Sequence, residues 1–118
     1  MANDFKRVCT PNVSNSSNST ICAVPNNSRA AVESIVIGIT AANKTSSGVT
    51  VDIFIDNEDG SNDVYIVKGA SIPAGASLEV MSGNKLVLQN DGTNGDNLEA
   101  LASAANSVDV TVSVLEDV

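Results

Sequence analysis

The last apolar segment of the chain alternates between two kinds of residue. Within 107–116, polar residues separate four valines, namely Val108, Val110, Val112 and Val114. A period of two is typical of a β-strand with one buried face and one solvated face. We therefore predict a strand whose valines line a core. Its other face, with Asp109, Thr111 and Ser113, carries nothing reactive.

Similar short segments recur along the chain, and turn residues separate them at intervals of about 8–12 residues. The pattern predicts eight or nine strands, at 5–9, 20–24, 30–42, 49–56, 63–68, 77–81, 85–89, 98–102 and 107–116. Local propensity at 98–102 favours a helical turn, whereas its context favours a strand, which we adopt. This spacing predicts an all-β fold, an antiparallel β-sandwich of about eight strands with jelly-roll or Ig-like topology. We expect a single domain over residues 1–118.

The longest apolar run, residues 35–39, could by its hydrophobicity form either a helix or a strand. Its β-branched residues and its interruption by Gly38 favour a strand. Because both faces of the run are apolar, we expect a central strand covered on both sides, with Gly38 at a bulge or at a close approach of another backbone.

Polar segments separate the strands. We expect 11–19 to be a flexible surface loop that does not pack. Asp56–Gly60 resembles a calcium loop, but its glycine is fifth rather than sixth and the closing glutamate is absent. We interpret it as a hairpin turn, and 90–97 as a second polar loop without an ion.

Composition narrows the possible functions. Aromatic residues make up 3% of the chain, namely Phe5, Phe54 and Tyr65, so the core must be aliphatic. The net charge of −8 argues against nucleic acid or an anionic membrane as a partner. No apolar run has the ~20 residues that span a bilayer. The N-terminal residues lack a signal-peptide core, so we expect synthesis and use in a cytosol.

Candidate chemistry is sparse. The chain has no histidine, and acids such as Asp52, Glu79 and Asp109 fall on predicted wet faces. We therefore expect no enzyme, and no catalytic, cofactor-binding or metal-binding residues. Cys9 and Cys22 leave two main alternatives, two reduced thiols or a disulfide across a hairpin of the first two strands.

Three segments of the chain carry a resemblance to a known group. These are 65–88, which begins Tyr-Ile-Val-Lys-Gly-Ala-Ser-Ile-Pro-Ala-Gly, the closing segment 103–116, and the opening Met1–Val8. Together they resemble small structural proteins of tailed phages, notably those of marine cyanobacteria. The resemblance implies a β-sandwich virion component present in many copies, and it offers no catalytic motif.

The resemblance favours a capsid decoration (cement) protein, with a neck or tail accessory protein as the alternative. The implied partners are the major capsid protein or other virion proteins, and the implied location is the virion, assembled in the host cytoplasm. We expect a homo-oligomer, for example a trimer. Expected contact elements are the N-terminal strand and the 11–19 and 90–97 loops. A receptor- or carbohydrate-binding module on a fibre is a hypothesis of another class, for which Tyr65 is the available stacking residue.

Overall fold

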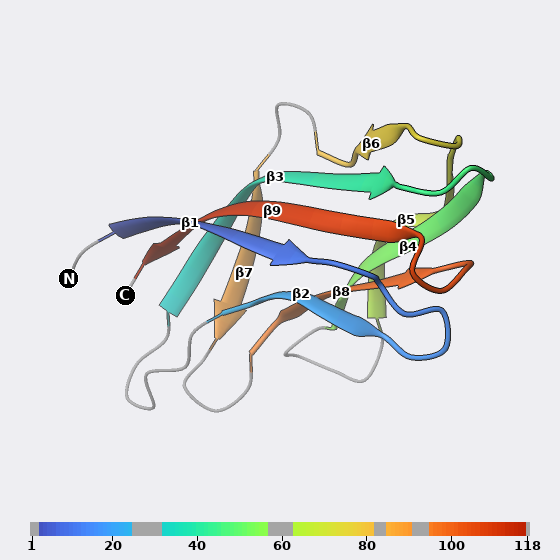
Figure 1. The fold of residues 1–118 in the computed structure, drawn as a ribbon. Helices are drawn as coiled ribbons and strands as arrows, with labels where there is room; N and C mark the ends of the chain where they lie inside the picture. Colours follow the sequence, from blue (N-terminus) through green and yellow to red (C-terminus); the bar gives the residue numbers. More distant parts are fainter. Residues whose placement is uncertain (1–2, 25–31, 57–62, 82–84, 91–94, 118) are drawn as a thin grey trace.

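The computed structural model describes residues 3–24, 32–56, 63–81, 85–90 and 95–117 (Figure 1). In this part of the chain the secondary structure consists of strands. They are β1 (Asn3–Thr10), β2 (Ser19–Ala23), β3 (Val32–Asn43), β4 (Val49–Asp56), β5 (Asp63–Ile72), β6 (Ser77–Glu79), β7 (Leu86–Asn90), β8 (Asn97–Ala102) and β9 (Val108–Asp117). Within these ranges no helix is long and apolar enough to cross a membrane.

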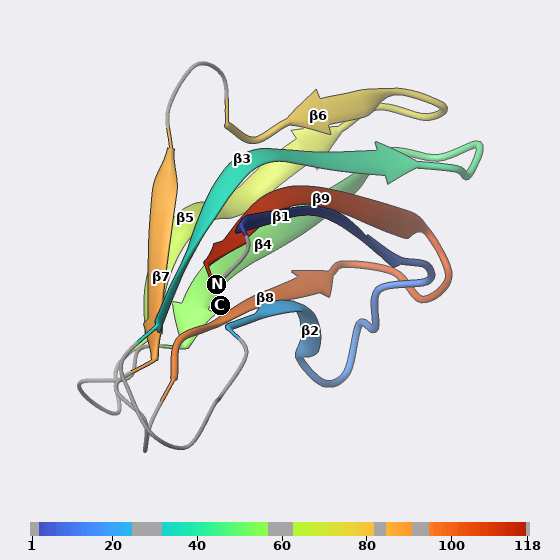
Figure 2. The ribbon, with the colours of Figure 1, turned by 90° about the vertical axis from the view of Figure 1, so that its left-hand side faces the viewer.

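The strands form two antiparallel sheets that pack face to face as a sandwich (Figures 1 and 2). Sheet A has the order β1-β9-β3-β6, with β7 also paired to β3, and sheet B has the order β2-β8-β4-β5. Successive strands mostly alternate between the sheets, and β4 and β5 form a direct hairpin. Two topologies were predicted, and this strand order is that of a jelly roll and not that of an Ig-like sandwich.

β3 bends in the middle and carries two strands along one edge. Its first half pairs with β7, over Val32–Val36, and its last residues pair with β6, over Thr40–Ala42. The register against β9 shifts between Val36 and Gly38, which confirms the predicted bulge. In Figure 2 the bend turns β7 steeply away from the direction of β6.

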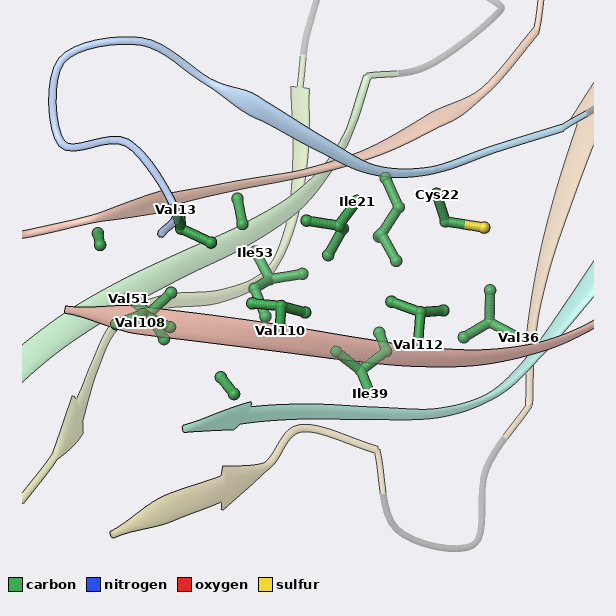
Figure 3. Close-up of a cluster of buried hydrophobic side chains, with 14 of the residues drawn as sticks. Val13, Ile21, Cys22, Val36, Ile39, Val51, Ile53, Val108, Val110 and Val112 are labelled. Carbon is green, nitrogen blue, oxygen red and sulfur yellow. The ribbon is translucent and has the colours of Figure 1, made fainter. Parts of the chain in front are cut away.

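The core lies between the sheets and is aliphatic, as the scarcity of aromatics predicted (Figure 3). All four valines of β9 are buried. They pack in one cluster with inward residues of β3, β4, β7 and β8, among them Val36, Ile39, Val51, Ile53, Leu88 and Leu98. The segment 98–102 is a strand, so its context did override its helical propensity.

Two expectations, and one alternative that the sequence left open, were wrong. The first two strands do not form a hairpin, because β1 pairs with β9 and β2 pairs with β8 in the other sheet. β3 is not covered on both sides, since Ile37 is exposed. The 11–19 segment packs at Val13, which is buried in the core and donates its N–H to the Val108 carbonyl at 2.9 Å.

Asn43 ties the two sheets together at one end of the sandwich. It ends β3, its side chain is buried, and its Nδ2 donates to the carbonyls of Ser47 (2.7 Å), Ile72 (3.0 Å) and Pro73 (3.2 Å). Its Oδ1 accepts from the backbone N–H of Thr45 at 2.9 Å and from its hydroxyl at 2.7 Å. One amide therefore fixes the β3–β4 turn and the end of β5.

The segment between β1 and β2 is held to the end of sheet A through Asp109. The Asp109 carboxylate accepts the backbone N–H of Asn12 at 2.9 Å and pairs with Lys44 at 3.0 Å. Asn12 has a left-handed backbone, with φ of 54°, which asparagine tolerates better than most residues. These contacts hold the pKa of Asp109 below its usual range, chiefly through the Asn12 hydrogen bond.

Replacing Asn43 by alanine is predicted to lower the free energy of unfolding by about 3 kcal/mol, because carbonyls that it bonds lose their donor. Asn43→Asp should also be destabilising at neutral pH, since a carboxylate cannot donate to carbonyls. Urea unfolding followed by circular dichroism measures both effects. Thr40→Ala, on the exposed face of β3, is the control and should change stability by less than about 0.5 kcal/mol. A loss of that small size for Asn43→Ala would contradict the role given to this amide.

The Asp109 contacts predict a dependence on pH. A carboxylate whose pKa is lower in the folded state stabilises the fold above its unfolded pKa, 3.8, and this stabilisation is lost as the pH falls through the lower folded value. Asp109→Asn should therefore lower the urea midpoint at neutral pH, and the gap from the unaltered protein should close in acid, once the pH lies below the lowered folded pKa of Asp109. Glu79→Gln, an exposed acid of sheet A, is the control. An equal gap at both pH values would rule out the ionic contribution.

Candidate functional site

Four apolar side chains lie in one row across the outer face of sheet A. Phe5 of β1 is directly opposite Leu115 of β9, Leu115 is opposite Ile35 of β3, and Ile35 is opposite Val87 of β7. Residues opposite one another in antiparallel strands point to the same face. We call this row, with the neighbouring Ile37, the apolar strip.

The strip is open to solvent at both ends. Phe5 is 77% exposed and Val87 is 51% exposed, while Leu115 and Ile35 between them are half-buried. Ile37, at the β3 bulge, is 42% exposed. Single exposed apolar residues are common, but a contiguous row over four strands is typical of a surface that contacts another molecule.

The strip exists because three strands break their alternation in the same place. Val36, Leu88 and Val114 point into the core, and each has an apolar neighbour in the sequence that points outward. These outward neighbours are Ile35, Val87 and Leu115. The next row along the sheet is already polar, with Arg7 opposite Ser113 and Ser113 opposite Gly38.

The outer face of sheet B carries an aromatic pair. The rings of Phe54 and Tyr65 lie 5.1 Å apart, and the ammonium of Lys68 lies 4.6 Å from the centre of the Tyr65 ring. Lys68 also pairs with Asp52 at 3.4 Å, and Asp52 accepts the Gly69 N–H at 2.6 Å. The Asp52 carboxylate, and after it Tyr65, raises the pKa of Lys68, so that Lys68 stays a cation over Tyr65.

This cluster covers Phe54 and does not form a binding cavity. Phe54 is buried on an outer face, whereas Tyr65 is 44% exposed. The described residues enclose no pocket, so Tyr65 does not line the concave polar site that a carbohydrate-binding module would need.

The two cysteines are free and face different surroundings. Cys9 of β1 is exposed, whereas Cys22 of β2 is buried in the core. Of the two alternatives, the structure therefore shows the reduced pair and not the disulfide. Burial, with a smaller effect of Glu116, raises the pKa of Cys22 to about 11.

The candidate acidic positions form no recognisable site. Residues 57–60 of the calcium-like loop and 91–94 of the second polar loop lie outside the described residues. Asp96, beside the second loop, accepts the Gln89 N–H at 3.0 Å. In the described ranges, no three His, Cys, Asp or Glu side chains gather as metal ligands. Glu79 is exposed as predicted, while Asp52 and Asp109 carry the contacts given above.

Sequence reasoning missed the apolar strip and the Asn43 amide. The strip had a signal, since the pairs Ile35–Val36, Val87–Leu88 and Val114–Leu115 each place apolar residues on both faces of a strand. Their alignment in one row depends on strand pairing, which the pattern does not give. For Asn43 the signal was an asparagine opening a turn with Thr45 two residues on.

No family model and no curated protein matches the chain. Among solved structures, it is similar to a chain in the structure of infectious bursal disease virus, Gx strain, at 13% identity and a TM-score of 0.47. That match covers 96% of this chain but only 29% of the viral one. It is also similar to a chain from the disulfide-linked pili of Bacillus endospore appendages, at 17% identity and a TM-score of 0.41, covering 98% of this chain and 88% of that one. Such likenesses concern the fold alone.

The cysteine environments predict different reactivity. In the native protein at neutral pH, a thiol reagent such as DTNB should label one cysteine rapidly, Cys9. Cys22 should react only after unfolding, because its raised pKa keeps the thiol protonated and burial excludes the reagent. Cys9→Ser should abolish the rapid phase and Cys22→Ser should retain it. Two rapid thiols, or an intact mass lower by two hydrogens without reductant, would contradict this assignment.

Proposed function

We propose that this protein is a structural component of a tailed-phage virion, and most specifically a capsid decoration protein that binds the outside of the head. The observation that carries the proposal is the apolar strip, an exposed row on a regular sheet. An exposed apolar face of this kind suits contact with another protein surface, and the described residues form no pocket of the sort that holds a small molecule.

Three further observations support this proposal. The resemblance of residues 65–88 and 103–116 to phage structural proteins points to the same class. Jelly-roll sandwiches recur in viral capsid and lectin domains, although the fold alone does not choose between them. A net charge of −8 suits a protein that contacts protein and not packaged DNA. We propose the major capsid protein as the partner of the strip, and we propose that the protein has no enzymatic activity.

Decoration also implies repetition. Contacts that are weak in one copy become collectively strong when symmetry repeats them over a shell. We therefore propose that the protein forms a homo-oligomer, either in solution or once it is bound to the capsid. A neck or tail accessory protein is the alternative, since the same strip would serve there at lower copy number.

The strip predicts which substitutions will remove the protein from particles. Val87→Lys, in the strip, should lower capsid occupancy by about tenfold or more, because a charge then enters the contact. Val64→Lys is the matched control, since Val64 is also an exposed valine, at 48%, but lies on β5 of sheet B. Cryo-electron microscopy of particles grown with each variant counts the copies per head.

The outcomes separate the alternatives. Hundreds of copies on the shell, lost with Val87→Lys and kept with Val64→Lys, would support decoration through the strip. A single ring at the portal vertex would replace decoration by the neck hypothesis. Equal occupancy for both variants would reject the strip as the contact, and absence from particles would reject the virion role.

A further inference from the structure

We propose that two copies of this protein associate through β1, side by side and antiparallel, about a two-fold axis perpendicular to sheet A. This contact would join the two sheets A into one continuous sheet. It makes the proposed self-association specific and rests on that part of the proposed function. It does not depend on whether the strip binds a capsid.

β1 is the most regular of the sheet edges in the described part of the chain. It stands at the end of sheet A, runs for eight residues and keeps an unbroken register against β9 from Asn3 to Thr10. Long, regular edge strands are templates for pairing with another chain, and proteins usually blunt them with bulges, charges or very short strands.

Each other edge carries such a protection. On β5 the register against β4 shifts twice, Lys68 is exposed and Gly69 has a left-handed φ of 66°. β2 is five residues long and contains a register shift, and β6 has only three residues. On β7, the backbone N–H and carbonyl of Gln89 are already bonded to Asp96, at 3.0 and 2.8 Å.

β1 also carries charges. Lys6 pairs with the nearly buried Glu116 at 2.9 Å, and Arg7 is exposed, so these charges limit the registers in which a second copy could pair. Phe5, next to Lys6, has 77% of its surface exposed at the free edge of the sheet. A buried contact would cover this large apolar side chain, and the edge of β1, which pairs with β9 alone among the described strands, would gain a second strand.

Charge selects the register and the occupant. A two-fold register centred on Lys6 or on Arg7 would place two identical charges opposite each other, which is unfavourable in a cross-strand pair. A register centred on Phe5 places Phe5 against Phe5 of the second copy and Lys6 opposite residue 4, an aspartate in the sequence. β1 is then complementary to itself, as a two-fold interface requires, and the occupant of this edge is a second copy.

The dimer would also change the apolar strip. With the axis perpendicular to the sheet, both strips lie on the same face and meet at Phe5. The combined row would run over eight strands, from Val87 of one copy to Val87 of the other. A dimer would then bring two strips to one partner surface, which strengthens binding without any new kind of contact.

Light scattering or sedimentation of the purified protein over a concentration series tests the proposal without any capsid. Phe5→Lys should weaken dimerisation at least about 100-fold, because two like charges then face each other at the centre of the contact. Val87→Lys is the matched control on the same face, on β7 at the opposite side of sheet A from β1, and should keep the dimer. Circular dichroism verifies that both variants are folded.

A second variant tests the register and does not rely on a disruptive change. In a Cys9→Ser background, Phe5→Cys should form an intermolecular disulfide on mild oxidation, since opposite Cα atoms of an antiparallel pair lie about 4.5–5.5 Å apart. Val87→Cys in the same background should not cross-link. A monomer at all concentrations, a dimer unaffected by Phe5→Lys, or a dimer that Val87→Lys also abolishes would overturn the β1 contact. A dimer without the Phe5→Cys cross-link would overturn the register. None of these results depends on capsid binding, so the virion role is judged separately.

Discussion

β9 is hydrogen-bonded on both sides, to β1 and to β3, and its four inward valines are buried between the sheets. This double constraint holds sheet A together, because removing β9 would leave β1 without a partner strand and open one wall of the core. The same strand fixes the outer surface. Once Val114 is inside, the pleat directs Leu115 outward, and the paired neighbours Phe5 and Ile35 follow it. The alternation of side chains along β9 thus places the valines in the core, and the apolar strip arises where this alternation is interrupted by Leu115.

The local pattern predicted the strands well because each is bounded by turn residues and built from β-branched or alternating positions. Even Leu98–Ala102, with helical propensity, is a strand, because its alternate residues Leu98 and Ala100 complete the core. Pairing was harder to predict, since it joins residues distant in sequence. Cys9 and Cys22 are close along the chain, yet β1 pairs with the last strand, as the jelly roll requires. The Asn43 amide depends likewise on Ile72 and Pro73 arriving beside it from β5.

The prediction that both faces of the run 35–39 would be covered was wrong, because the described chain covers only one of them. The run is apolar on both faces, but the folded chain covers only the face with Val36 and Ile39. A sequence pattern records which faces avoid water and does not record whether the cover comes from the same chain. Ile37 and Val87 stay uncovered within the described part of the chain, and they belong to the apolar strip that the proposed contact would cover.

The two phenylalanines also differ in how they are covered, and this difference concerns the edge of sheet A. Tyr65 and Lys68 shield Phe54 on sheet B, so that ring is buried although it faces outward. Among the described residues nothing shields Phe5 in this way, and it lies on β1, an edge strand of sheet A. An exposed phenylalanine contributes nothing to the core of a monomer, and it raises the risk of unwanted association. In a chain with so few aromatics, its position is best explained by a contact that covers the side chain and the strand edge together. The proposed pairing of β1 with a second copy would do both, and it would leave the rest of the apolar strip free for the proposed partner.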